Sequence, residues 1–194
     1  MRTASVVRNT KETKVKVDLN LDGVGEYEIK TGISFFDHML TQIARHGIFD
    51  LQITAVGDLE VDSHHTVEDI GIVLGQALKK ALGEKTSISR YGSAYVPMDE
   101  ALALVVIDLS GRAYLKFKAD LGKNRLGNFD VELVEEFFRA VSYQSGMNLH
   151  IHLLDGTNLH HCSEAIFKAF GRALAAAVKI DERVGEIPST KGIL

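Results

Sequence analysis

The strongest constraint in this sequence is an internal repeat whose period is about half of the chain. Residues 64–81 (HHTVEDIGIVLGQALKKA) align with residues 160–177 (HHCSEAIFKAFGRALAAA) at a shift of 96. The identical pairs include His64/His160, His65/His161, Glu68/Glu164, Gly75/Gly171, Ala77/Ala173, Leu78/Leu174 and Ala81/Ala177. A repeat this long indicates a duplicated domain, because solenoid repeats recur every 20 to 50 residues or so.

An earlier segment repeats as well, and both halves carry the same order of predicted elements. Glu12, Val17, Leu21 and Gly23 lie over Glu100, Val105, Leu109 and Gly111. Alternating apolar residues predict strand pairs, 14–21 with 26–30 and 102–109 with 113–118, each joined as a hairpin across Asp22-Gly23 or Ser110-Gly111. Helical spacing predicts helices over 34–45 and 130–143, followed by strands over 51–56 and 149–154.

The repeated segment closes each half as a helix. Its predicted caps are Asp62/Ser63 and Asn158, and its buried stripe in the first half is Val67, Ile70, Leu74, Leu78 and Ala81. The predicted order is therefore ββαβα, twice, over residues 1–88 and 89–194 of one compact domain. Strands and helices in this order favour an α+β fold.

Composition excludes several classes of function. The net charge of −4 and the pI near 6.1 leave no basic stripe for a nucleic-acid backbone, so we expect no nucleic-acid partner. No apolar run reaches membrane-spanning length and residues 1–5 lack an apolar signal core, so we expect no membrane association and a cytoplasmic location. The single cysteine, Cys162, has Thr66 as its counterpart and is predicted to serve packing.

The string His-His-x-x-Glu occurs once in each half, at His64-His65 with Glu68 and at His160-His161 with Glu164. By composition it should occur only about 0.02 times in a chain of this length. At the start of a helix, residues three and four apart project from one side of the first turn. Imidazole and carboxylate donors on rigid helical positions therefore predict a metal site, with His38 as a further donor on the preceding helix.

A single exposed histidine pair would more often be a solvated surface feature, and it is the duplication that favours metal binding. Imidazole and carboxylate without thiolate suit Mn, Fe, Zn or Ni, and a water-rich octahedral site would favour Mn. Basic residues at turn ends form a second signal: Arg90, Arg112, Lys168 and Lys191, the last in a Ser189-Thr190-Lys191 tail. Each alone is ordinary surface charge, but together they could clamp a phosphate.

Three strings together resemble the imidazoleglycerol-phosphate dehydratase family of histidine biosynthesis: FDHML at 36–40, VDSHHTVEDIG at 61–71 and GTNLHHCSEA at 156–165. The similarity also covers 97–101, 108–112 and 188–192. It implies a duplicated α+β subunit with helices between two four-stranded sheets. It further implies a homo-oligomeric shell of 24 subunits, with two Mn²⁺ per active site at subunit junctions.

The resemblance also implies roles for individual residues. One metal would take His38, His65, His160 and Glu164, and the other His64, Glu68 and His161, with Glu136 as its fourth ligand where relatives can carry histidine. Contacts to a small phosphate substrate would fall to Arg90, Arg112, Lys168, Ser189, Thr190 and Lys191. His38, His46 and Glu12 would also contact the substrate, and Glu12, Glu68 and Glu164 are the candidate catalytic carboxylates.

The implied reaction removes the hydroxyl beside an imidazole ring and a proton from the next carbon, which is not acidic. Metal ions on both ring nitrogens would favour the imidazolate, which can expel hydroxide and leave a diazafulvene. Glu12 would then take the proton, giving an enol that relaxes to imidazole-acetol phosphate. Two alternatives remain at this point: a metal-dependent hydrolase with a bridging water, and metals that only hold subunits together.

Overall fold

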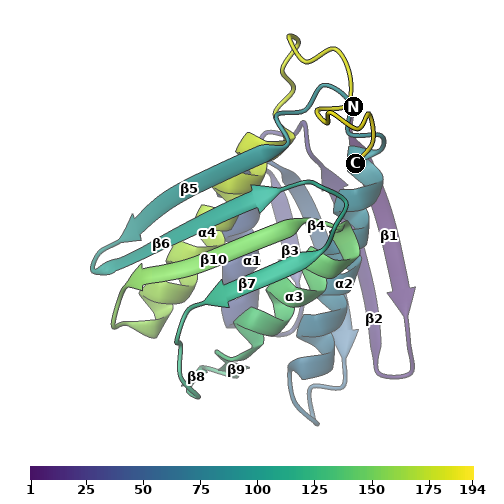
Figure 1. The fold of residues 1–194 in the computed structure, drawn as a ribbon. Coiled ribbons are helices and arrows are strands. Elements are labelled where there is room, and N and C mark those ends of the chain that lie inside the picture. Colours follow the sequence, from purple (N-terminus) through teal and green to yellow (C-terminus); the bar gives the residue numbers. More distant parts are fainter.

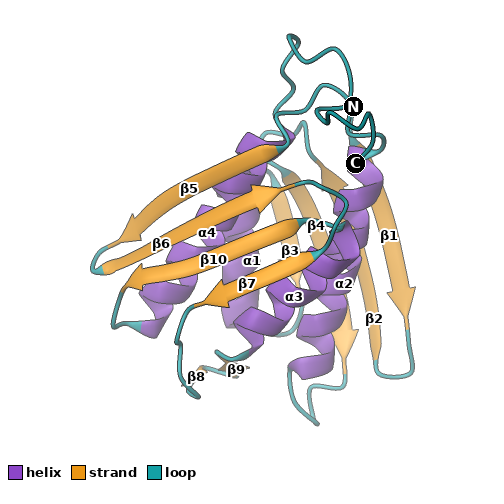
Figure 2. Cartoon of the chain, viewed as in Figure 1, coloured by secondary structure: helices purple, strands orange, loops and turns teal.

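The computed structural model describes residues 1–194 as two four-stranded sheets with four helices between them (Figures 1 and 2). The first half contains β1 (Thr3–Asn9), β2 (Thr13–Asn20), β3 (Tyr27–Lys30), α1 (Ser34–Gly47), β4 (Asp50–Gly57) and α2 (His64–Leu82). The second contains β5 (Tyr91–Met98), β6 (Ala101–Asp108), β7 (Tyr114–Lys118), α3 (Leu133–Ser145), β10 (Asn148–Asp155) and α4 (Leu159–Val178). A short pair, β8 (Arg125–Leu126) and β9 (Phe129–Asp130), precedes α3. The α+β class and the two four-stranded sheets are confirmed.

Each four-stranded sheet has one strand more than predicted, so the ββαβα order is wrong. Both halves share the order βββαβα, and the second half also carries the short β8–β9 pair before α3. The missed strands, β1 and β5, form equivalent edges of the two sheets. Their alternation is weak because only Ala4 in β1, and Gly92 and Val96 in β5, are buried. Edge strands bury little of either face, and β5 carries Pro97, which a central strand would exclude.

The predicted hairpins are also wrong, because β2 does not pair with β3 and β6 does not pair with β7. The sheet orders are β1-β2-β4-β3 and β5-β6-β10-β7, with β4 and β10 inserted between the expected partners. The carboxylate of Asp50 explains the first insertion. Its Oδ1 accepts hydrogen bonds from the backbone N–H groups of Val24 (2.8 Å) and Glu26 (3.1 Å). The turn after β2 is thereby anchored to β4, and the true hairpins join β1 to β2 and β5 to β6.

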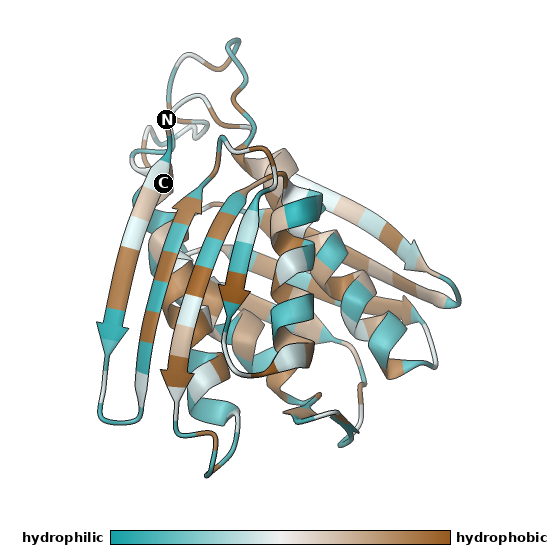
Figure 3. Cartoon of the chain, turned by 180° about the vertical axis from the view of Figure 1, so that it is seen from behind, coloured by the Kyte–Doolittle hydropathy of each residue, from teal (hydrophilic) through white to brown (hydrophobic).

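The helices pack in pairs that mix the halves, α1 against α4 and α2 against α3, so both repeats share one hydrophobic core of 50 buried residues. The predicted stripe on α2 is buried throughout. The repeat glycines make this packing possible: a Cβ on Gly75 would lie 2.8 Å from Val141 O, and one on Gly171 2.9 Å from Ile43 O. Apolar and polar bands alternate along β1 to β4, as expected for a sheet with one face on the core (Figure 3).

None of the helices combines the length and the apolar character that crossing a membrane requires.

Candidate metal centre and anion pocket

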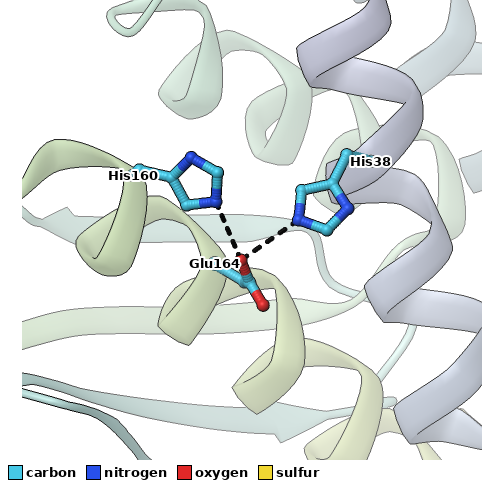
Figure 4. A group of neighbouring side chains, drawn as sticks. All are labelled: His38, His160 and Glu164. Carbon is cyan, nitrogen blue, oxygen red and sulfur yellow. Dashed lines mark hydrogen bonds and ion pairs between the residues drawn. The ribbon is translucent and has the colours of Figure 1, made fainter.

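Three of the predicted metal ligands converge between α1 and α4 (Figure 4). The Nε2 atoms of His38 and His160 lie 3.1 Å and 3.0 Å from the same oxygen, Oε2 of Glu164. The ligand atoms of all three residues lie within 4.8 Å of one another. Glu164 is buried, whereas His38 is exposed and His160 is half-buried, so the cluster opens to solvent on one side.

Local structure places the α4 donors on the first turns of that helix. The side chain of Asn158 accepts hydrogen bonds from the backbone N–H groups of His160 and His161, so the predicted cap is confirmed. Glu164 then lies one turn after His160 and faces it. In α2, Asp62 Oδ1 accepts from His64 N (2.7 Å), which makes Asp62 rather than Ser63 the residue whose side chain caps the helix.

Glu164 is held as a carboxylate. Burial alone would raise its pKa, but hydrogen bonds from Lys168 and His38 outweigh burial and lower the pKa. The Lys168 contact is an ion pair of 2.7 Å to Oε1, which leaves Oε2 for the two histidines. A carboxylate that stays ionised beside two imidazoles is a donor set suited to a divalent cation.

The second histidine of each pair points elsewhere. The rings of His160 and His161 are nearly perpendicular, with an interplanar angle of 84°, and those of His64 and His65 make an angle of 88°. His161 Nδ1 lies 2.8 Å from Oε2 of Glu100, and its Nε2 lies 3.8 Å from exposed Asp99. In the first half, His65 Nδ1 lies 3.0 Å from Oδ2 of Asp58. These carboxylates raise the pKa of each histidine.

The remaining predicted ligands are not gathered within the chain. His64 Nε2 lies 3.9 Å from Oε2 of Glu68, one turn later on α2. Glu136, on α3, lies 3.6 Å from Arg139 on its own helix. The structure therefore brings three of the eight predicted ligands together and leaves the others half-buried or exposed near the N-termini of α2, α3 and α4.

Glu12, the candidate base, lies in the β1–β2 turn beside α2. Its Oε2 is 3.9 Å from His65 Nδ1, beyond hydrogen-bond distance, and its side chain is 56% exposed. The turn is anchored by buried Asp69 of α2, which accepts hydrogen bonds from Arg8 (2.8 Å) and Thr13. The carboxylate of Glu12 is thus held near His65, a predicted ligand, without forming a hydrogen bond to it.

Most of the predicted phosphate ligands meet at a second place, an open cavity of about 970 Å³. Its lining includes Arg90, Arg112, Ser189, Thr190 and Lys191. Arg90 is engaged within the chain, because it donates to Asp108 Oδ1 (2.7 Å) and to the carbonyl of Pro188 (2.8 Å). The Arg112 side chain is exposed and has no such partner, so its guanidinium group is free to bind an anion in the cavity.

Besides Glu12 and His38, two further residues predicted to contact the substrate, Lys168 and His46, lie away from this cavity. Lys168 belongs to the histidine cluster, through its ion pair with Glu164. His46 lies at the end of α1, where burial and the nearby charges of Lys168 and Arg172 lower its pKa. Neither residue lines the cavity.

The histidine cluster and the anion cavity are far apart in one chain. The backbone N–H of Arg90 donates to the carbonyl of Ala177, near the C-terminus of α4, whereas His160 lies at the start of the same helix. Seventeen residues of α-helix separate these two positions by about 25 Å. In Figure 1 the C-terminal tail lies at the opposite end of α4 from the β10–α4 loop.

Asp58 and Glu100 were missed as site residues, although both contact predicted ligands. Glu100 had a signal, since it aligns with Glu12 in the repeat. Asp58 had none, because its contact with His65 depends on how the loop after β4 folds back on α2.

The chain is similar to known proteins over its whole length. The family model for imidazoleglycerol-phosphate dehydratase matches residues 31–174. Imidazoleglycerol-phosphate dehydratases of Caldanaerobacter subterraneus subsp. tengcongensis and Heliobacterium modesticaldum are 60% and 61% identical, each with full coverage of both chains.

Solved structures show the same fold. The crystal structure of imidazoleglycerol-phosphate dehydratase from Staphylococcus aureus has a TM-score of 0.84 and 45% identity, covering 92% of this chain and 99% of its own. The enzyme from Pyrococcus furiosus also has a TM-score of 0.84, with 41% identity over 97% of this chain and 100% of its own. The chain therefore belongs to the imidazoleglycerol-phosphate dehydratase family, a family of hydro-lyases.

Proposed function

We propose that this hydro-lyase converts imidazoleglycerol phosphate to imidazole-acetol phosphate with two Mn²⁺ ions per active site, as a cytoplasmic homo-oligomer with active sites between subunits. The observation that carries the proposal is the convergence of His38, His160 and Glu164 from two helices of different repeats. The Nε2 atoms of both histidines lie within hydrogen-bond distance of the same carboxylate oxygen, Oε2 of Glu164, so the three side chains meet at one point.

The donors fit a divalent cation of intermediate hardness. Two imidazole nitrogens and one carboxylate oxygen are already close enough for a single ion, and no thiolate takes part. The one cysteine, Cys162, is buried and faces the interior. We assign His38, His160, Glu164 and His65 to one manganese ion, and His64, Glu68, His161 and Glu136 to the other.

Assembly follows from the separation within one chain. The substrate consists of a five-membered ring, a three-carbon chain and a phosphate, and it is too short to bridge about 25 Å. If the phosphate binds at Arg112 and the ring binds at the histidines, the two regions must come from different copies of the chain. His65 likewise points away from the His38 cluster, so it would complete that cluster in a neighbouring copy. We propose that such contacts build the shell of 24 subunits.

Each group of the chain then has a task in the dehydration. Bound manganese would favour the deprotonated imidazole ring of the substrate, which makes departure of the neighbouring hydroxyl possible. Glu12, whose carboxylate is exposed and lies beside His65, accepts the proton from the adjacent carbon. Arg112 and Lys191 hold the phosphate, and Ser189 and Thr190 donate hydrogen bonds to it.

Turnover of imidazoleglycerol phosphate tests this function directly. The manganese-loaded protein is incubated with the substrate, the ketone product is followed by its absorbance, and inorganic phosphate is measured in parallel. We expect ketone without phosphate release, and no ketone after chelation. Phosphate release would indicate a metal-dependent hydrolase instead, and uptake of manganese with neither product would leave the metals a purely structural role.

A further inference from the structure

The two halves use their equivalent turn glutamates differently. Glu12 in the β1–β2 turn and Glu100 in the β5–β6 turn occupy the same repeat position. Glu100 is fully engaged: its Oε2 lies 2.8 Å from His161 Nδ1, and its Oε1 accepts from the backbone N–H groups of Asn158 (2.7 Å) and Thr157 (3.2 Å). Glu12 makes no side-chain hydrogen bond to the equivalent histidine, His65, which lies 3.9 Å away.

Asp58 takes the corresponding place in the first half. Its Oδ2 lies 3.0 Å from His65 Nδ1, the same ring atom that Glu100 contacts in His161. The other oxygen of Asp58, Oδ1, is buried and has no hydrogen-bond partner, so the contact with His65 is the principal polar contact of this carboxylate.

The second half has no carboxylate at the position equivalent to Asp58. Gly57 and Gly156 correspond, because a Cβ on Gly57 would meet Oγ1 of Thr66 and a Cβ on Gly156 would meet Sγ of its repeat counterpart, Cys162. The residue that stands where the first half has Asp58 is therefore Thr157, whose backbone N–H donates to Glu100 Oε1 (3.2 Å). The carboxylate for His161 must therefore come from another element, and Glu100 supplies it.

An ionised carboxylate can only accept a hydrogen bond, so each of these histidines carries its proton on Nδ1. The lone pair is then on Nε2, which both rings direct away from the carboxylate. We propose that Asp58 and Glu100 are positioning residues that select this tautomer, so that Nε2 of His65 and of His161 can each bind a divalent cation. This inference rests on the proposed metal site. It also accounts for Glu12, which Asp58 leaves free to act as the base.

The substitution Glu100→Gln separates this role from simple support of the loop. The amide oxygen of glutamine can still accept from the backbone of Thr157 and Asn158. Its NH₂ group, however, donates towards His161 Nδ1 and favours the opposite tautomer, with the proton on Nε2. Metal binding through that nitrogen is then blocked, whereas a residue that only supported the loop would be replaced without loss.

The test measures Mn²⁺ binding to the metal-stripped full chain, with free Mn²⁺ quantified by electron paramagnetic resonance. We expect Glu100→Gln and Asp58→Asn each to weaken one of the two manganese ions per chain by about 10- to 100-fold, the range for partners of metal-bound histidines. Glu28→Gln is the matched control, because Glu28 is exposed and pairs only with Lys30. Its manganese affinity should equal that of the wild type.

A second readout needs no metal. In metal-free protein labelled with ¹⁵N-histidine, Glu100→Gln should move one histidine from the Nδ1–H to the Nε2–H tautomer. Equal manganese affinity of wild type and Glu100→Gln, or an unchanged tautomer, would overturn this inference and leave the proposed function standing. A wild-type chain that binds no manganese would overturn the proposed function itself. Asp58→Asn tests the same claim in the other half should Glu100→Gln fail to fold.

Discussion

The Nε2 atom of His38 lies 3.1 Å from Oε2 of Glu164, although 126 residues separate them in the sequence. This contact joins α1 of the first repeat to α4 of the second, and it places a buried carboxylate opposite an exposed imidazole. These two atoms, with Nε2 of His160, are the ones that would hold a divalent cation here.

Glu164→Gln should therefore remove one manganese ion. The amide is a weaker ligand and carries no charge, so we expect manganese affinity at that site to fall by more than about 100-fold, beyond the range for outer partners of ligands. Dehydration should fall with it. Glu84→Gln, at an exposed residue, is the control. Isothermal titration with Mn²⁺ checks the result, and retention of two tight ions in Glu164→Gln would remove Glu164 from the ligand set.

His65→Ala should abolish activity and loosen the assembly. His65 points away from the cluster of its own chain, so we expect it to complete a metal centre in a neighbouring copy. Loss of that ligand would weaken the contact between copies, and removal of the metal by a chelator would do the same. Size-exclusion chromatography with and without chelator measures the assembly, and turnover of the substrate measures the activity. A His65→Ala protein that keeps its full size and activity would contradict the ligand assignment.

Arg112→Ala and Arg90→Ala should differ in stability but agree in KM. Arg112 has no side-chain partner in the chain, so its loss should raise KM and leave unfolding free energy within about 0.5 kcal/mol. Arg90 also holds Asp108 and the tail carbonyl of Pro188, so its loss should additionally cost about 1–3 kcal/mol. Steady-state kinetics and urea unfolding distinguish them. Equal stability of the two variants would show that the Arg90 contacts contribute little.

Glu12→Gln should reduce kcat by about 10²- to 10⁴-fold, the range for a general base. KM and manganese stoichiometry should stay near their wild-type values, because Glu12 is not bound to His65. Glu12→Gln and Glu100→Gln therefore separate the base from the positioning residue: the first loses turnover and the second loses metal. A Glu12→Gln enzyme with unchanged kcat would exclude Glu12 as the base.

His46 should make the metal-free protein less stable in acid. Burial, with Lys168 and Arg172 nearby, lowers the pKa of His46 below its ordinary value of 6.5. The unfolded chain therefore takes up a proton first, so the stability present above pH 6.5 is lost as the pH falls through the folded-state pKa. His46→Gln should lose less stability than the wild type between pH 7.5 and pH 5, measured by urea unfolding. Parallel pH curves would assign the acid sensitivity to other groups.

The repeat and its helices could be predicted from the sequence because they depend on local patterns. Apolar spacing located α1 to α4 to within a few residues, and the His-His-x-x-Glu strings identified the donors. The strand order could not be predicted in this way. Turn residues at Asp22-Gly23 favoured a hairpin. The carboxylate of Asp50, however, accepts a hydrogen bond from the backbone N–H of Val24, just after this turn, and β4 lies between β2 and β3.

The site also combines features that depend on local sequence with features that depend on tertiary contacts. Residue types and their helical spacing determined which side chains can bind a cation, since both are properties of a few adjacent positions. Which histidine joins which carboxylate depended on the packing of α1 against α4 and on the path of the loops after β4 and β5. His160 therefore meets His38, whereas His161, its neighbour in sequence, turns by about one quarter of a circle to meet Glu100. Contacts between distant segments arise only when the core closes, and no local pattern encodes them.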